Sequence, residues 1–179
     1  VQLILEDVPD TRTSWNAEDF MAAAHHLGQF NGAYVGSRLP SWWWLSSSPV
    51  RAWAMATVPA VLRDLRSATT EAVRGVDLAL AQSTAELVWR HRRWLASRLV
   101  ALPMTIGHLD PHRRNLLTAH DGRLVAIDWA MTGVDAVGVD PSQMFASSAM
   151  RLDLSDDLPG VFDAISASYR AGLRESGCG

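Results

Sequence analysis

Lysine is absent from this chain of 179 residues, whose 16 basic residues are all arginine, and cysteine occurs only once, at Cys178. A single cysteine excludes an intrachain disulfide framework and is typical of a reducing compartment, so we expect a cytoplasmic protein. No apolar run reaches the roughly 18 residues of a membrane-spanning helix. The net charge of −3 argues against a broad nucleic-acid-binding surface. We therefore expect neither nucleic acid nor a membrane as a partner.

The composition is otherwise that of an ordinary globular domain. Apolar residues make up 48% of the chain and charged residues 20%, and a chain of this length can form one domain with a sizeable core. The sequence opens on an apolar, strand-like run, Val1 to Leu5, with no second strand pattern beside it. An isolated strand is unusual for a whole domain, so we expect the chain to be part of a longer protein.

The spacing of apolar residues predicts mostly helices. The predicted helices cover residues 16–34, 50–56, 59–67, 83–100, a segment beginning at 140, and 158–174. Asn16 or Ser14 can cap the first helix, Ser83 has the Ser-x-x-Glu form of a capping box, and Asp140 followed by proline is typical of a helix start. Helices therefore account for most of the predicted structure.

One hairpin interrupts this helical pattern. A strand is predicted over residues 104–107, and Asp121-Gly122 separates two further apolar runs at 116–117 and 124–127. An Asp-Gly pair between such runs is a strong hairpin signal. The predicted fold class is thus an α-rich α+β domain with a small β-hairpin.

The stretch HLDPHRRN, residues 108–115, is the most polar loop beside this hairpin. Pairing of the two hairpin strands would bring Asn115, just before the first, next to Asp128, just after the second. An amide and a carboxylate side by side are oxygen ligands that suit Mg²⁺ when phosphates supply the rest. Asp110 could then accept a hydrogen bond from a hydroxyl group. Together the three residues suit phosphoryl transfer to an alcohol.

The same residues resemble a known family. His108, Asp110, His112 and Asn115, followed by Ile127-Asp128-Trp129, resemble the His-Gly-Asp-x-His-x-x-Asn and Ile-Asp-aromatic motifs of aminoglycoside phosphotransferase and choline kinase-like proteins, the small-molecule branch of the protein-kinase-like fold. Asp140 is similar to a structural aspartate that follows these motifs, and the opening LILEDV resembles the hinge strand between two kinase lobes. The sequence departs from the pattern in two places: Leu109 replaces a glycine, and Arg113-Arg114 replaces a common Pro-Gly pair.

The resemblance implies a hinge strand over residues 1–9 and the helical C-terminal lobe of a kinase-like fold over 10–179, with the N-terminal lobe absent. No glycine-rich loop precedes the hinge and no lysine is present to pair with phosphates, so we expect the fragment alone to be inactive. The implied reaction moves the γ-phosphoryl group of ATP or GTP to a hydroxyl of a small molecule, such as an aminoglycoside-like, choline-like or other amino-alcohol or amino-sugar acceptor.

The resemblance also implies roles for individual residues. Asp110 would be the catalytic base, Asn115 and Asp128 would hold Mg²⁺, and His108 and His112 would support the loop. Backbone groups of three hinge residues would meet the nucleotide base, namely Glu6, Asp7 and Val8. The run Trp42, Trp43 and Trp44 could line or cover the acceptor pocket.

Three other interpretations remain. His108, Asp110 and His112 alternate as ligand-type residues and could bind Zn²⁺ or Fe²⁺ in a metal-dependent hydrolase, although Pro111 argues against a regular strand there. The chain could also be an inactive kinase-like binding module. Finally, the stretch could be an ordinary polar loop, which would make the further matches at Asp128 and Trp129 coincidental.

Overall fold

A computed structural model describes residues 10, 14–35, 39, 45–47, 59, 63, 78–150 and 157–177. The expected hinge strand, with Glu6, Asp7 and Val8, lies outside these residues. So do the tryptophans at 42–44 and nearly all of the helices expected between 50 and 67. The stretch 108–115, the hairpin and the residues that follow it up to 150 are all described.

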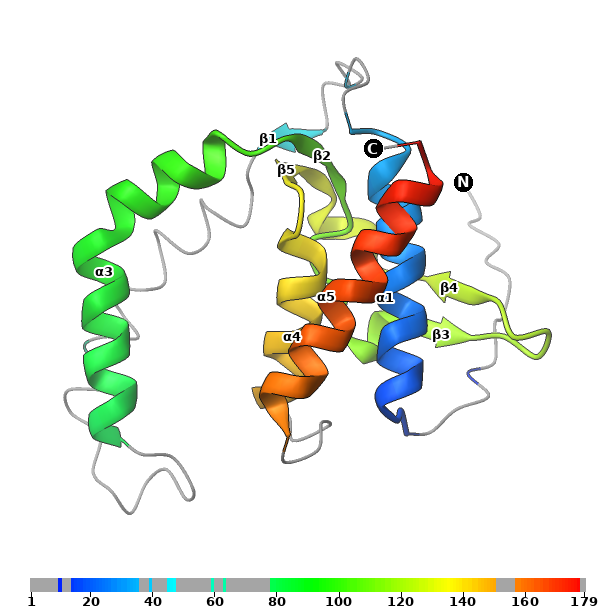
Figure 1. Ribbon diagram of the computed structural model, residues 1–179, viewed down its shortest axis with the longest axis horizontal. Coiled ribbons are helices and arrows are strands. Elements are labelled where there is room, and N and C mark those ends of the chain that lie inside the picture. The colour runs from blue at the N-terminus through cyan, green and yellow to red at the C-terminus, as the bar shows by residue number, and fades with distance from the viewer. Residues whose placement is uncertain are drawn as a thin grey trace, which may run out of the picture.

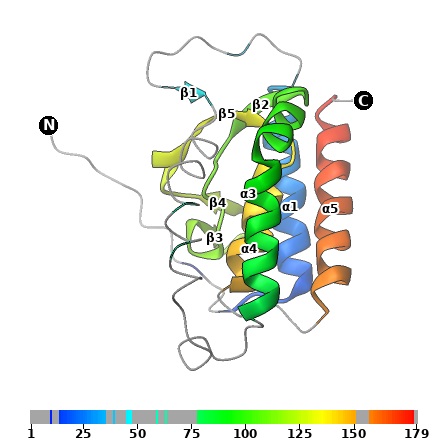
Figure 2. The ribbon, with the colours of Figure 1, turned by 90° about the vertical axis from the view of Figure 1, so that its left-hand side faces the viewer.

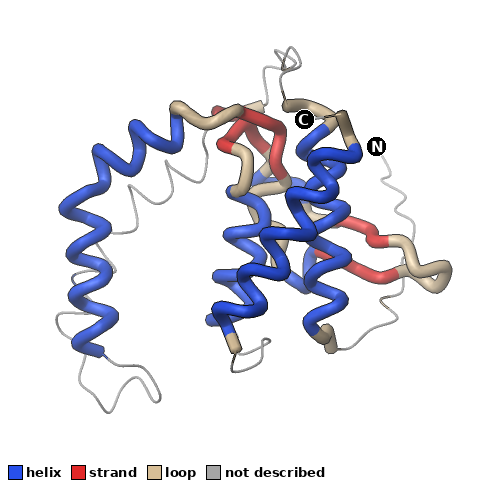
Figure 3. The backbone as a smooth tube through the Cα atoms, in the orientation of Figure 1, coloured by secondary structure: helices blue, strands red, loops and turns tan. Residues whose placement is uncertain are grey.

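The described chain is mostly helical, with two small sheets (Figure 3). The helices are α1 (Ala17–Gly32), α3 (Leu78–Val100), α4 (Val139–Met150) and α5 (Leu158–Glu175). One sheet has the strand order β1 (Ser46–Ser47), β5 (Gly133–Ala136) and β2 (Met104–Gly107), with β5 parallel to β1 and antiparallel to β2. The other is the hairpin of β3 (Leu116–Thr118) and β4 (Leu124–Ala126). This confirms the expected mostly helical fold with a small hairpin. No helix of the described ranges has both the length and the hydropathy to cross a membrane.

Helix α1 begins where its sequence predicts. The Asn16 side chain accepts a hydrogen bond from the backbone N–H of Asp19 at 3.0 Å, and the Asp19 carboxylate accepts one from the Asn16 N–H at 2.9 Å. This reciprocal capping box satisfies two of the N–H groups that every helix start leaves without partners. Phe20, Ala24 and Leu27 then lie buried along one face, and this face fixes α1 against the core.

Helices α1 and α5 lie side by side (Figures 1 and 2), and both contribute residues to the hydrophobic core. Glycines permit their close approach: a Cβ atom on Gly28 would lie 2.2 Å from the Tyr169 carbonyl oxygen, and one on Gly172 would lie 2.0 Å from that of His25. Both distances are far below van der Waals contact, so any side chain there would push the helices apart. Around this contact the core includes Phe20, Leu116, Met144, Ile165 and Tyr169.

The structure differs most clearly from the sequence prediction at two helix starts and one strand. Helix α3 begins at Leu78, so Ser83 lies inside the helix and is not its cap. Strand β5 was not predicted, yet it pairs along its whole length with β2. Helix α4 begins at Val139, which puts Asp140 inside the first turn. The carboxylate of Asp140 points back to the loop after β2, as described below.

Candidate functional site

The stretch 108–115 leaves the buried strand β2 and leads directly into the hairpin. Leu116 pairs with Ala126 in the hairpin register, and the backbone N–H of Ile127 donates to the carbonyl oxygen of Asn115 at 2.9 Å. The pairing therefore continues one residue past the strands and brings Asn115 beside the residue that precedes Asp128. The hairpin that the sequence predicts is confirmed, and it joins the two halves of the motif.

Asp110 is held through the side chain of Asn115. The buried Asn115 amide donates from Nδ2 to the Asp110 carbonyl oxygen at 3.0 Å and to its carboxylate Oδ2 at 3.2 Å. The Asp110 side chain is 44% exposed, and within the described ranges no hydrogen bond engages its Oδ1 atom. One carboxylate oxygen is thus fixed by the protein, while the other can accept a hydrogen bond from a ligand.

His108 is fully buried and both of its ring nitrogens have partners. Nε2 lies 2.8 Å from the carbonyl oxygen of Ile127, to which it can only donate, and Nδ1 accepts from the Asp110 N–H at 3.3 Å. The ring also packs on Trp129, with centroids 4.6 Å apart. This histidine therefore ties the loop to the end of the hairpin and has no nitrogen left for a metal ion.

The hydrolase interpretation is not favoured for the same reason. It needs the nitrogens of His108 and His112 together with Asp110 around one ion. In the described part of the chain, no group of three or more His, Cys, Asp or Glu side chains could hold a metal ion. A site built on the His108-x-Asp110-x-His112 alternation therefore lacks its donors.

His112 faces Asp110 from within the loop. Its Nδ1 accepts from the backbone N–H of Arg114 at 3.2 Å, and its Nε2 lies 3.7 Å from Asp110 Oδ2. Because Nδ1 is an acceptor, the neutral ring carries its proton on Nε2, the atom that faces the carboxylate. Both the Asn115 amide and the His112 ring therefore face Oδ2 of Asp110.

Asp128 stands in a strained and exposed position. Its φ angle is +57°, in the left-handed region that costs a residue with a side chain about 1–2 kcal/mol. Its carboxylate does not cap the short turn that follows, Trp129–Met131. The Trp129 indole N–H donates to the Ala126 carbonyl oxygen at 2.9 Å, and its ring packs edge-on against Phe30 of α1. These contacts hold the backbone around Asp128 while its carboxylate faces solvent.

Asp140 anchors the other side of the loop. Its Oδ2 accepts from the His108 N–H at 3.0 Å and its Oδ1 from the Leu109 N–H at 2.8 Å. Burial raises the pKa of this carboxyl, against the opposing effect of hydrogen bonds from Asn31, Leu109 and His108. Leu109 has a φ of +61° and is buried, so the position where the resemblance has glycine keeps the glycine-like backbone here. The clamp by Asp140 holds that backbone in place.

Two residues of this network were not predicted from the sequence. Asn31, at the end of α1, donates from Nδ2 to Asp140 Oδ2 at 3.0 Å and to the Ile106 carbonyl oxygen at 2.8 Å. Tyr169 of α5 donates its hydroxyl to Asn31 Oδ1 at 2.7 Å. A polar side chain four residues after Leu27, on the apolar face of α1, is the one sequence signal that could have revealed Asn31.

Arg113, one of the two departures from the family pattern, serves the structure of the loop. Its Nη1 lies 2.8 Å from Asp10 Oδ2, and its guanidinium carbon lies 5.8 Å from the centroid of the Trp15 ring. The side chain is 15% exposed. Since Asp10 also accepts from the Thr118 N–H at 3.2 Å, Arg113 helps fasten the loop and hairpin to the segment before α1.

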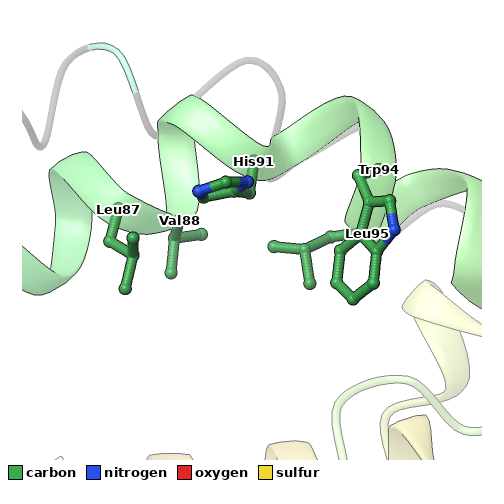
Figure 4. A pocket seen from close by; sticks show the side chains of 5 residues that line it. All are labelled: Leu87, Val88, His91, Trp94 and Leu95. Atoms are coloured by element: carbon green, nitrogen blue, oxygen red, sulfur yellow. The ribbon is translucent and has the colours of Figure 1, made fainter.

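An apolar groove runs along α3, away from these residues in sequence (Figure 4). Leu87, Val88, His91, Trp94 and Leu95 line a cavity of about 600 Å³, and all five side chains come from this one helix. Trp94 is 57% exposed. Such a face is more apolar than the solvated side of a surface helix usually is.

Comparison with known proteins agrees with these motifs. Residues 43–175 match the model of the phosphotransferase enzyme family, a span that takes in the stretch 108–115, the hairpin, Asp140 and all of α5. Helix α1, with Asn31, lies before it. Searches of curated proteins and of solved structures returned no match. The chain therefore belongs to the phosphotransferase enzyme family.

Proposed function

We propose that this chain is the C-terminal lobe of a kinase-like enzyme that moves the γ-phosphoryl group of ATP or GTP to a hydroxyl of a small molecule, such as an aminoglycoside-like, choline-like or other amino-alcohol or amino-sugar acceptor. The observation that carries the proposal is the hydrogen bond from Asn115 to the half-exposed carboxylate of Asp110. It joins the two residues that the family motif pairs for this chemistry.

Asp110 is the proposed catalytic residue. Its Oδ1 would accept the hydrogen bond, and then the proton, of the acceptor hydroxyl as the oxygen attacks the γ-phosphorus atom, while the bond from that atom to the β-phosphate oxygen breaks and the nucleoside diphosphate leaves. Asn115 and His112 both face Oδ2, so they would keep the carboxylate from rotating. Fixing this group before the substrate arrives is what lowers the entropic cost of the reaction.

Mg²⁺ would be held by the amide oxygen of Asn115 and by the carboxylate of Asp128. Both are the hard oxygen donors that Mg²⁺ prefers, and two protein ligands are enough when nucleotide phosphates and water supply the others. The Asn115 Nδ2 atom is engaged by Asp110, which leaves the oxygen end of the same amide for a cation. When bound, the ion neutralises charge on the transferred phosphoryl group.

The remaining nucleotide contacts are proposed to come from the hinge and from a preceding lobe. Backbone groups of Glu6, Asp7 and Val8 would meet the base. The chain contains no lysine, so the phosphate-binding lysine of a kinase-like site would come from the preceding lobe.

The test is a phosphorylation screen of hydroxyl compounds with the full-length protein and γ-labelled ATP or GTP. Asp110→Ala should abolish label transfer while the far-ultraviolet circular dichroism stays unchanged. Asp163→Ala removes an exposed carboxylate from α5 and should transfer label like the wild type. Turnover by Asp110→Ala close to the wild-type rate would rule out the proposed function.

A further inference from the structure

The hydroxyl group of Tyr169 lies where three parts of the molecule meet. It is buried, with 3% of the residue exposed. It donates to Asn31 Oδ1 of α1 at 2.7 Å and accepts from the Gly138 N–H at 3.2 Å, just before α4. A phenol that both donates and accepts in this way fixes the two groups relative to each other.

Both of these partners lead to Asp140. Asn31 donates to Asp140 Oδ2 at 3.0 Å, and Gly138 precedes Asp140 by two residues, with a φ of +96° that turns the chain into α4. Tyr169 therefore restrains Asp140 through the side chain that contacts it and through the backbone that carries it.

The hydroxyl also determines which way the Asn31 amide points. Its O–H donates to Oδ1, so the Nδ2 end of the amide faces Asp140 and the Ile106 carbonyl oxygen. If the amide turned over, an oxygen would face the Asp140 carboxylate, and a buried oxygen–oxygen contact of this kind is costly. The donor from Tyr169 thus excludes the wrong orientation.

From these contacts we propose that Tyr169 is a positioning residue for the catalytic stretch, acting through Asn31 and Asp140 on the backbone of His108 and Leu109. Asp110 follows Leu109 directly, and its own N–H donates to the His108 ring. The effect of the Tyr169 hydroxyl therefore passes through Asn31, Asp140 and the backbone before it reaches the Asp110 carboxylate, which would meet the substrate hydroxyl. This inference rests on the proposed function, because a catalytic role for Asp110 is what gives the positioning its consequence.

The first experiment needs no activity. Tyr169→Phe keeps the ring and removes only the hydroxyl. Amide hydrogen exchange is followed by NMR on the whole chain. The His108 and Leu109 amides should exchange about tenfold faster than in the wild type, because the buried Asn31 Oδ1 loses its donor and Asn31 no longer holds Asp140 firmly. The amides of Ala24 and Ile165, in the cores of α1 and α5, should keep their wild-type rates.

Tyr34→Phe is the matched control. Tyr34 packs against Phe30, and in the part of the chain that the structure describes its hydroxyl makes no hydrogen bond. This variant should leave the His108 and Leu109 amides unchanged. Equal acceleration at every amide in Tyr169→Phe, or none at His108 and Leu109, would overturn the proposal. Asn31→Ala should accelerate the same two amides, which provides a second route to the same answer.

The second experiment measures phosphoryl transfer by the full-length protein. Tyr169→Phe should lower kcat about tenfold with little change in the KM for nucleotide. In the Asn31→Ala background the same substitution should cost less than it does in the wild type, because only the contact with the Gly138 N–H remains to be lost. Additive losses would contradict an action through Asn31. If the wild type transfers no phosphoryl group, the proposed function fails, whereas the exchange experiment still tests the network.

Discussion

The two sides of the stretch 108–115, the proposed catalytic loop, are built in opposite ways. On the inner side, Asp140 and Asn31 are almost fully buried, and their polar atoms have several protein partners. On the outer side, Asp110 and Asp128 keep exposed carboxylates, and Trp129 beside them is 43% exposed. The inner side therefore determines backbone geometry, and the outer side offers groups to ligands. Changes on the outer side should affect chemistry, and changes on the inner side should affect stability first.

The largest effect should come from the outer side. Asp128→Gly removes a proposed Mg²⁺ ligand and should lower phosphoryl transfer by about a thousandfold. Stability should stay the same or rise by up to about 1 kcal/mol, because glycine adopts the left-handed backbone of this position without strain. Enzyme assays and urea denaturation measure the two effects. A loss of more than about 1 kcal/mol in stability would show that the carboxylate also supports the fold.

The inner side should respond in the opposite way. Asp140→Ala leaves the N–H groups of His108 and Leu109 and the Asn31 amide buried without their acceptor. Each such donor costs about 1–3 kcal/mol, partly offset because a buried carboxylate is removed, so the free energy of unfolding should fall by about 3 kcal/mol. Urea denaturation tests this, with Asp163→Ala as an exposed control expected to change less than about 0.5 kcal/mol. Similar stabilities for the two variants would contradict the clamp.

A smaller effect on stability distinguishes the contribution of the Leu109 backbone conformation from that of its buried side chain. Both Leu109→Ala and Leu109→Gly lose a buried side chain, which costs about 2–5 kcal/mol. Only glycine also relieves the left-handed backbone, so Leu109→Gly should be about 1 kcal/mol more stable than Leu109→Ala. At an ordinary position the order is reversed. Thermal or urea unfolding of the two proteins side by side provides the measurement, and a less stable glycine variant would argue against the positive φ.

The subtlest effect concerns pH. Burial raises the pKa of Asp140 above its ordinary value. The stability that this carboxyl contributes is therefore fully present when the pH is below its pKa in the unfolded chain, and it is lost as the pH rises through its pKa in the folded protein. The difference in unfolding free energy between wild type and Asp140→Asn should therefore decrease as pH rises through this interval. Urea denaturation across acidic pH values measures it. A difference that grows with pH would mean that the hydrogen bonds from Asn31, His108 and Leu109 lower the pKa of Asp140 by more than burial raises it.

The features that the sequence predicted well are local ones. The reciprocal cap of Asn16 and Asp19 needs residues only three apart, and the hairpin follows from Asp121-Gly122 between two apolar runs. The last helix begins at Leu158 as expected. The family resemblance was recognisable because the residues that carry it lie in one short motif and one hairpin.

The features that the sequence did not predict depend on distant partners. Strand β5 has the unremarkable sequence Gly-Val-Asp-Ala and forms because β2 and β1 flank it. The Tyr169–Asn31 bond joins residues 138 positions apart, and no local pattern shows that these two side chains meet. The carboxylate of Asp140 could have capped its own helix, and only the arrival of the His108 and Leu109 N–H groups decides where it points.

The glycine contact between α1 and α5 has a consequence for synthesis on the ribosome. The motif at 108–115 leaves the ribosome well before Gly172, yet its anchor Asn31 is oriented by Tyr169 and seated by the close packing of Gly28 against α5. A nascent chain can therefore form the hairpin and the cap of α1 early, because both are local. The alignment of the proposed catalytic aspartate waits for the last described helix.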